Sequence, residues 1–101
     1  MGERNSIFLV NDGIYLYSHW DREEDLILIL KNALSRGLDR WHDRHYLNRI
    51  IFSEMIKDDI LSLTGFGLST DEPDGQIVLK VDIDNKKVNG ISFSDFLKEN
   101  E

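Results

Sequence analysis

Residues 6–20 read SIFLVNDGIYLYSHW, and they set the architecture of the chain. Two β-prone runs flank Asn11-Asp12-Gly13, and Asp-Gly between such runs is a strong hairpin signal. The two predicted strands are 6–10 and 14–18. The strand that ends at Ser18 leads at once into a helix start, so residues near Trp20 lie at a strand-to-helix turn. Such a turn points unpaired backbone N–H groups toward whatever lies in front of the helix.

The first helix is predicted from about residue 22 to Arg36. Asp21-Arg22-Glu23-Glu24 has the spacing of a capping box, with Asp21 as the N-cap. The apolar residues that follow recur at helical spacing and predict a core-facing stripe. Gly37 stands where a left-handed residue commonly ends a helix.

A second helix is predicted from about Asp43 to Leu61, with Asp43 as its N-cap and an inner face that extends to Ile60. Only residues 38–42 connect the two helices. Because this connector is short, the helices are expected to pack as an antiparallel hairpin.

The rest of the chain is predicted to be mainly β. Its strands are 66–70, 76–83 and 86–88, and Ser92-Phe93-Ser94-Asp95 starts a short C-terminal helix. The order β-β-α-α-β-β-β-α favours an α+β fold, in which a helical hairpin covers one face of a mainly antiparallel sheet. No linker or repeat divides the chain, so residues 1–101 are predicted to form a single domain.

Charge and composition narrow the classes of function. The net charge is −7, of which residues 1–50 carry −1 and residues 51–101 carry −6. An acidic protein is repelled by phosphate backbones, so generic nucleic-acid binding is not expected. There is no cysteine, the longest apolar run is Leu26–Leu30, and residues 1–5 lack the features of a secretion signal. These features favour a cytoplasmic protein without membrane contact.

Two groups of side chains are candidates for binding. The first comprises Tyr15, Tyr17, His19 and Trp20 at the strand-to-helix turn. The two tyrosines share one face of the strand, and the imidazole can give or take a proton. The alternative is that His19 and Trp20 have purely structural roles.

The second group comprises Arg40, Trp41, Tyr46 and Arg49. Guanidinium groups beside aromatic rings suit a planar or anionic ligand through cation–π and bidentate contacts. The alternative is that the aromatic rings pack between the helices while the arginines pair with nearby acids. We expect the two groups to converge, so that His19 and Arg40 share one hollow.

No metal or cofactor site is predicted. His42 and His45 have chelating spacing, but Asp43 is needed as the N-cap and no third ligand is supplied. Residues 65–70 lack the lysine that ends a phosphate loop, and the acids between Asp71 and Asp84 are typical of solvated turns.

The chain resembles a family of small uncharacterised proteins of phage and prokaryotic genomes. The resemblance covers residues 14–97 and is carried by three segments. They are YLYSHW at 15–20, RWHDRHYLNRIIF at 40–52 and GFGLST at 65–70. It implies no activity and transfers no catalytic residue. The family has a glycine-rich turn after the tryptophan, whereas this chain has Asp21-Arg22, so a backbone contact to a ligand is not implied there.

These features favour a small non-enzymatic binding module. Its partner is predicted to be a protein or a small anionic ligand, bound through the aromatic and arginine side chains of the two groups. An alternative is a small hydrolase or nucleotide-processing enzyme that uses His19 with Ser18 or Asp43. A third is an assembly component that forms homo-oligomers through a strand edge or an aromatic face.

Overall fold

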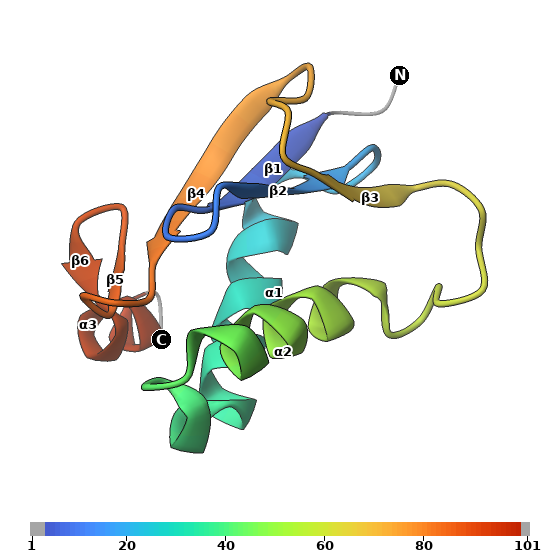
Figure 1. Ribbon diagram of the computed structural model, residues 1–101. Helices are drawn as coiled ribbons and strands as arrows, with labels where there is room; N and C mark the ends of the chain where they lie inside the picture. Colours follow the sequence, from blue (N-terminus) through green and yellow to red (C-terminus); the bar gives the residue numbers. More distant parts are fainter. Residues whose placement is uncertain (1–3, 100–101) are drawn as a thin grey trace.

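The computed structural model describes residues 4–99 and confirms the α+β fold (Figure 1). One six-stranded sheet lies over the helices. The elements are β1 (Asn5–Leu9), β2 (Ile14–Ser18), α1 (Glu23–Arg36), the 3-10 turn η1 (Leu38–Arg40), α2 (Arg44–Ile56), β3 (Phe66–Ser69), β4 (Gln76–Asp82), β5 (Lys87–Val88), β6 (Ile91–Ser92) and α3 (Phe93–Lys98).

The strand order is β3-β2-β1-β4-β5-β6, and four of the five pairings between described strands are antiparallel. The predicted hairpin is confirmed, although β1 begins at Asn5 and Val10 belongs to the turn. The exception is the parallel pairing of β1 with β4, which the sequence analysis did not predict. The short strand β6 was also not predicted.

The two faces of the sheet differ in composition. Strand alternation places Ile7 and Leu9 of β1 opposite Leu16 and Ile14 of β2, on the face toward the helices. They form one core with β4 and the helices. Its most buried members also include Leu26, Leu30, Leu34, Leu47, Ile51, Leu79, Val81 and Phe93.

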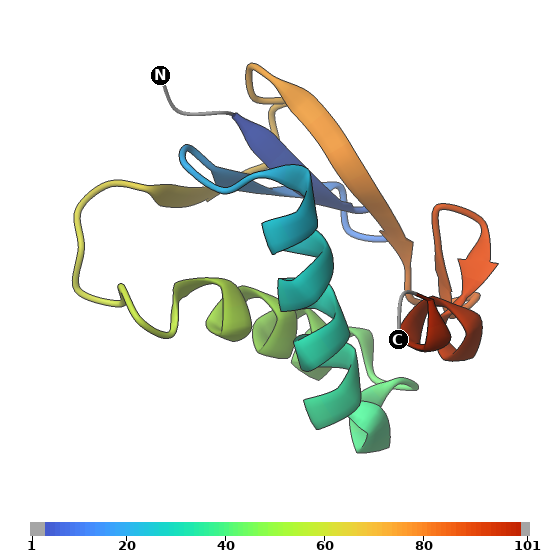
Figure 2. The same cartoon turned by 180° about the vertical axis from the view of Figure 1, so that it is seen from behind.

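Helices α1 and α2 pack against each other on this inner face and cross obliquely (Figures 1 and 2). The prediction that a helical hairpin covers one face of the sheet is confirmed, although the two helices cross obliquely rather than lie antiparallel. In the described residues no helix has the length and apolar character needed to cross a bilayer. Within the part of the chain that the structure describes, no helix covers the opposite face of the sheet.

The start of α1 differs from the prediction by one residue. The N-cap is Arg22, whose backbone N–H donates to the Asp25 carboxylate at 2.9 Å. Asp21 lies outside the helix, and its N–H donates to the Ser18 hydroxyl at 3.1 Å. Asp21 forms part of the tight turn that follows β2, so Arg22 rather than Asp21 is the N-cap of α1.

The end of α2 was also predicted wrongly. The helix stops at Ile56 rather than Leu61, and Ile60 is exposed instead of lining the inner face. Asp58 and Asp59 follow the last turn, where negative charge opposes the negative end of the helix dipole. The N-cap prediction is confirmed, since Asp43 Oδ1 accepts the Tyr46 N–H at 3.3 Å.

Gly37 does not adopt the predicted left-handed conformation, because its φ is −96°. A Cβ at this position would lie 3.0 Å from both the Ala33 carbonyl oxygen and Leu47 Cδ1. The glycine therefore serves the close approach of α2 to the end of α1 rather than a left-handed cap.

The chain ends in a small unit built from β5, β6 and α3. The predicted capping of the last helix is confirmed, because Ser92 Oγ accepts the Asp95 N–H at 3.1 Å. Phe93 and Phe96 are buried against the core. Lys31 of α1 lies over the Phe96 ring, 5.7 Å from its centroid, which fastens α3 to α1.

Candidate functional site: an aromatic row on the uncovered sheet face

The face of the sheet without helices carries the residues that alternate with the core. Phe8 pairs with Tyr15 across β1 and β2, and Ser6 pairs with Tyr17. Because Ile7, Leu9 and Leu16 face the core, these four side chains point to the other side. The sequence analysis identified both tyrosines on one face but did not identify Phe8. The register of β1 with β2 places Phe8 beside Tyr15 on this face.

Aromatic rings follow one another along β2 and into the turn beyond it. Phe8 and Tyr15 are stacked with centroids 4.3 Å apart and planes 17° apart. Tyr17 meets His19 edge-on at 6.3 Å, and His19 lies 4.3 Å from Trp20. We call these five residues the aromatic row. It forms a half-exposed apolar strip with polar edges, which is the composition of a contact surface.

Gly67 leaves space beside the middle of this row. It pairs with Tyr17 across β2 and β3, so its missing side chain would stand on the same face. A Cβ there would meet no atom within 4 Å. On the other side of Tyr17, the buried Ser6 hydroxyl has no hydrogen-bond partner within residues 4–99. The Tyr17 position is therefore flanked by an open notch and an unused polar group.

The row ends against the loop that joins α2 to β3. The His19 N–H donates to the Gly65 carbonyl oxygen at 2.9 Å. Trp20 is 63% exposed, and in the loop Leu61 and Leu63 are 91% and 98% exposed. Figure 1 shows this loop leaving α2 and returning to the sheet edge at β3. The end of the aromatic row is thus hydrogen-bonded to a loop that carries two exposed leucines.

The second predicted group lies at the other end of α1. The Arg40 guanidinium lies 5.2 Å from the centroid of the Tyr46 ring, and both side chains are exposed, as is Arg49. Trp41 is half-buried instead. Its Nε1–H donates to the Leu34 carbonyl oxygen at 2.9 Å and its ring meets Phe93 edge-on, so Trp41 joins α1 to α3.

The two groups do not converge. His19 precedes α1 and Arg40 follows it, and a 14-residue helix is about 20 Å long. The prediction that His19 and Arg40 share one hollow is therefore wrong. The helix that both segments flank holds them apart.

The residues of the enzymatic alternative also lie apart. Ser18 is buried, and its hydroxyl is occupied by the Asp21 N–H. Asp43 caps α2, beyond the far end of α1 from His19. Within residues 4–99 no group of three or more histidine or carboxylate side chains is arranged to hold a metal ion.

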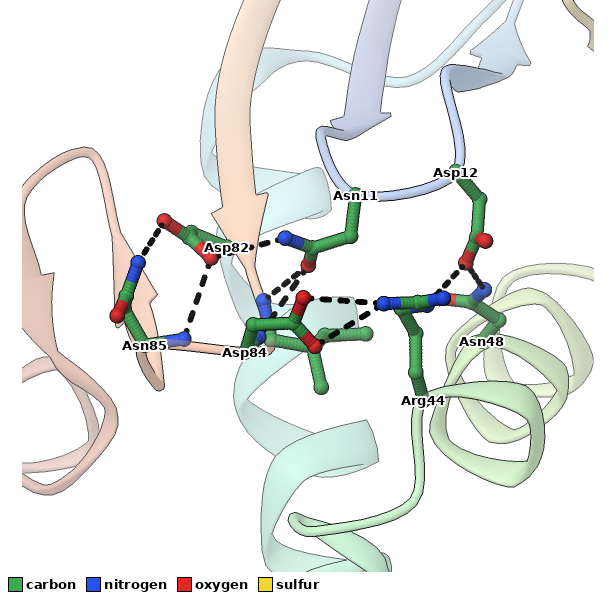
Figure 3. A network of polar contacts seen from close by, with 8 residues as sticks. Asn11, Asp12, Arg44, Asn48, Asp82, Asp84 and Asn85 are labelled. Carbon is green, nitrogen blue, oxygen red and sulfur yellow. Dashed lines mark hydrogen bonds and ion pairs between the residues drawn. The ribbon is translucent and has the colours of Figure 1, made fainter.

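A polar network at the opposite end of the sheet was missed by the sequence analysis (Figure 3). Arg44, at the start of α2, lies between two acidic turns. Its Nε lies 3.1 Å from Asp12 of the β1–β2 turn, and its Nη1 donates to both carboxylate oxygens of Asp84, at 3.0 and 3.1 Å. Asn48 donates to the same Asp12 carboxylate at 2.6 Å. The network joins α2 to both turns.

The turn after β4 is held by side-chain hydrogen bonds of the same network. Asn11 Oδ1 accepts the N–H of Ile83 at 2.7 Å, and Asn11 Nδ2 donates to Asp82 at 3.1 Å. Hydrogen bonds from Asn85, followed by that from Asn11, lower the pKa of Asp82. The Asn-Asp-Gly signal of the hairpin was visible in the sequence. No local sequence pattern indicates the second role of Asn11, which is to hold a turn some seventy residues away in the chain.

Comparison of the chain with protein-family models, with curated proteins and with solved structures gives no match. The resemblance to small phage and prokaryotic proteins therefore stays a prediction. Function is argued below from the geometry of the site.

Proposed function

We propose that this protein is a small non-enzymatic binding module that engages a protein partner through the aromatic row. The observation that carries the proposal is an uncovered sheet face with two groups of contacting rings, Phe8 with Tyr15 and Tyr17 with His19 and Trp20, which neighbour each other along β2. Aromatic side chains supply large contact area at low entropic cost, and they are enriched where proteins meet. The exposed leucines of the adjoining loop extend the apolar surface.

The charges favour a protein over a nucleic acid or a small anion. Two rows of cross-strand neighbours lie in the middle of the open face, one through Tyr15 and one through Tyr17. Among the described residues of these rows, Lys80 is the one basic side chain. Three of the six arginines are engaged in ion pairs within the molecule, namely Arg22, Arg36 and Arg44. A phosphate or carboxylate ligand would find few free cations near the row.

The charges also favour a different protein over a second copy of this chain. Asp71, Glu72 and Asp74 follow β3, which is the edge strand of the sheet next to β2. A two-fold contact through this face would bring acidic segments of both copies together, which is repulsive. The absence of cysteine fits a cytoplasmic setting for such a complex.

The proposal is tested with Gly67→Thr. The position has ordinary backbone angles and open space, so threonine fits the strand while its side chain fills the notch beside Tyr17. Proteins retained by the wild-type chain are identified and purified, and their affinities are measured by calorimetry. We expect Gly67→Thr and Tyr17→Ser each to lower the affinity for the retained partner tenfold or more. A tenfold loss is on the order of 1.4 kcal/mol of binding free energy.

Arg40→Ala and Arg49→Ala are the matched controls at the far end of α1. Loss of affinity in these variants, with unchanged affinity in Gly67→Thr, would place the site at the arginines and overturn the proposal. Light scattering between micromolar and millimolar concentration measures self-association directly. A dimer that Gly67→Thr dissociates would show that the row binds a second copy instead.

A further inference from the structure

A cleft of about 290 Å³ opens between α1, the end of α2 and the start of β3. Its walls are apolar and come from Leu28 and Ile29 of α1, Met55 of α2 and Phe66 of β3. Ile29 and Phe66 are partly buried against the core, Met55 is buried in it, and Leu28 is exposed. The cleft can therefore take a slender apolar group without disturbing the fold.

The rim of the cleft is mainly acidic. It carries Asp21, Asp58 and Asp59, and within residues 4–99 no ion pair joins a basic side chain to any of the three. Lys57 also lines the cleft, but its ammonium group is paired with Glu54. A fourth carboxylate, Glu54, is already neutralised. It receives hydrogen bonds from Lys57 at 2.7 Å and from Arg36 at 3.2 Å.

The directions of the pKa shifts separate Glu54, which has cationic partners, from Asp21, which has none among the described residues. The Lys57 hydrogen bond is the main cause that lowers the pKa of Glu54. Burial raises the pKa of Asp21, a nearby Asp25 adds to that effect, and the Ser18 hydroxyl opposes it. A partly desolvated carboxylate without a counter-ion gains most when a cation arrives.

The cleft adjoins the aromatic row. A Cβ placed on Gly65 would lie 3.4 Å from Asp59 Oδ2 and 3.9 Å from Trp20 Cδ1, so the rim acid and the last ring of the row flank the same residue. A partner that covers Trp20 therefore also comes close to Asp59 at the rim of the cleft.

We propose that the cleft receives an arginine side chain of the protein that covers the aromatic row. The inference rests on the proposed function and adds the chemistry of the partner. The arginine stem would lie against Leu28 and Met55, and its guanidinium would meet the rim carboxylates. A hydrated metal ion would not suit apolar walls, whereas an aliphatic stem that ends in a cation suits both walls and rim.

Arginine is preferred to lysine because the rim carboxylates come from different segments. Asp21 precedes α1, whereas Asp58 and Asp59 follow α2. A planar guanidinium presents five N–H donors in several directions and is weakly hydrated, while an ammonium is a compact and strongly hydrated charge. One guanidinium can therefore bridge both segments.

The test uses three small probes with the whole chain: N-acetyl-arginine amide, the lysine equivalent, and the uncharged citrulline equivalent. Backbone amide shifts are followed by NMR during titration to tens of millimolar. We expect the arginine probe to move the amides of residues 21, 28–29 and 55–59 with saturation. The lysine probe should bind several-fold more weakly, and citrulline should not saturate.

Asp21→Asn and Asp58→Asn should each weaken the arginine probe on the order of tenfold, because each removes one rim charge. Asp74→Asn removes an exposed acid outside the cleft and serves as the matched control. Circular dichroism verifies the fold of each variant. Equal binding of citrulline, shifts that cluster elsewhere, or unchanged affinity in both rim variants would overturn the inference, and equal binding of lysine would overturn the choice of arginine.

The two proposals fail separately. The arginine probe does not touch the sheet face, so Gly67→Thr should leave its binding unchanged. If the probe binds but Gly67→Thr retains full affinity for the protein partner, the sheet-face proposal fails alone. If Gly67→Thr loses the partner but the probe does not bind, the cleft inference fails alone.

Discussion

The Gly37→Ala substitution tests whether α2 packs closely against the end of α1. The added Cβ would lie 3.0 Å from the Ala33 carbonyl oxygen, 3.0 Å from Leu47 Cδ1 and 3.2 Å from Ile50 Cδ1. Carbon atoms in contact prefer about 3.5–4.0 Å, so either the end of α1 or the facing side chains must shift. The oxygen of Ala33 is held by the Gly37 N–H at 2.8 Å and cannot move freely.

The magnitude follows from two opposing effects. Overpacking of a well-packed contact costs about 1–3 kcal/mol, whereas replacing glycine lowers the entropy of the unfolded chain by an equivalent of about 0.4–1 kcal/mol. We expect Gly37→Ala to lower the free energy of unfolding by about 1–2 kcal/mol, measured by urea denaturation at 25 °C.

Ile50→Val completes a double-mutant cycle, because valine lacks the Cδ1 that the new Cβ would meet. Alone it should cost about 0.5–1.5 kcal/mol. Since it makes room at the contact, the double variant should lose less stability than the two single variants together, by about 0.5 kcal/mol or more. Strict additivity would mean that the two side chains do not meet.

Gly37→Asn separates close packing from a left-handed cap. Asparagine tolerates the left-handed conformation better than alanine, so a cap would make Gly37→Asn the milder change. Close packing predicts the reverse, because asparagine is larger. Higher stability of Gly37→Asn than of Gly37→Ala would refute the packing argument.

Three further outcomes are expected. Arg44→Met should lower stability by about 1 kcal/mol in thermal denaturation, and by less in 1 M salt, because its ion pairs to the two acidic turns are partly exposed. Gly75→Ala should cost more than about 2 kcal/mol in urea denaturation, since φ is +98° and a Cβ would lie 2.2 Å from the Arg4 carbonyl oxygen; a smaller loss would contradict this geometry. Hydrogen bonds, the strongest from Asn85, lower the pKa of Asp82 below the 3.8 of an unperturbed carboxyl. The resulting stability is complete above that value and is lost as the pH falls through the lower folded-state pKa, so Asp82→Asn should show a flatter dependence of the urea midpoint on acid pH.

Local signals account for most of the elements. The Asn-Asp-Gly turn, the Asp43 cap and the Ser92 cap each act within four residues, and all three are confirmed. The parallel pairing of β1 with β4 joins segments some seventy residues apart, and no local pattern encodes it. The end of α2 was missed because apolar periodicity continues to Ile60 while the paired aspartates stop the helix.

The candidate site was predictable in part. Alternation placed Tyr15 and Tyr17 on one face, and the apolar pattern indicated which face the helices cover. The addition of Phe8 needed the strand register, and the acidic cleft needed the path of the loop after α2. The separation of His19 from Arg40 follows from the length of α1, which the sequence also predicted. The expected shared hollow neglected that length.

The parallel pairing of β1 with β4 has a consequence for the nascent chain. β1 is synthesised before β4, and the strand that covers its second edge is complete only once Asp82 has been synthesised. At typical ribosomal speeds of about 5–20 residues per second, that edge stays open for several seconds. During this interval a bare apolar strand is available to neighbouring chains, so the rate of translation through the middle of the sequence should affect how much protein is recovered in folded form.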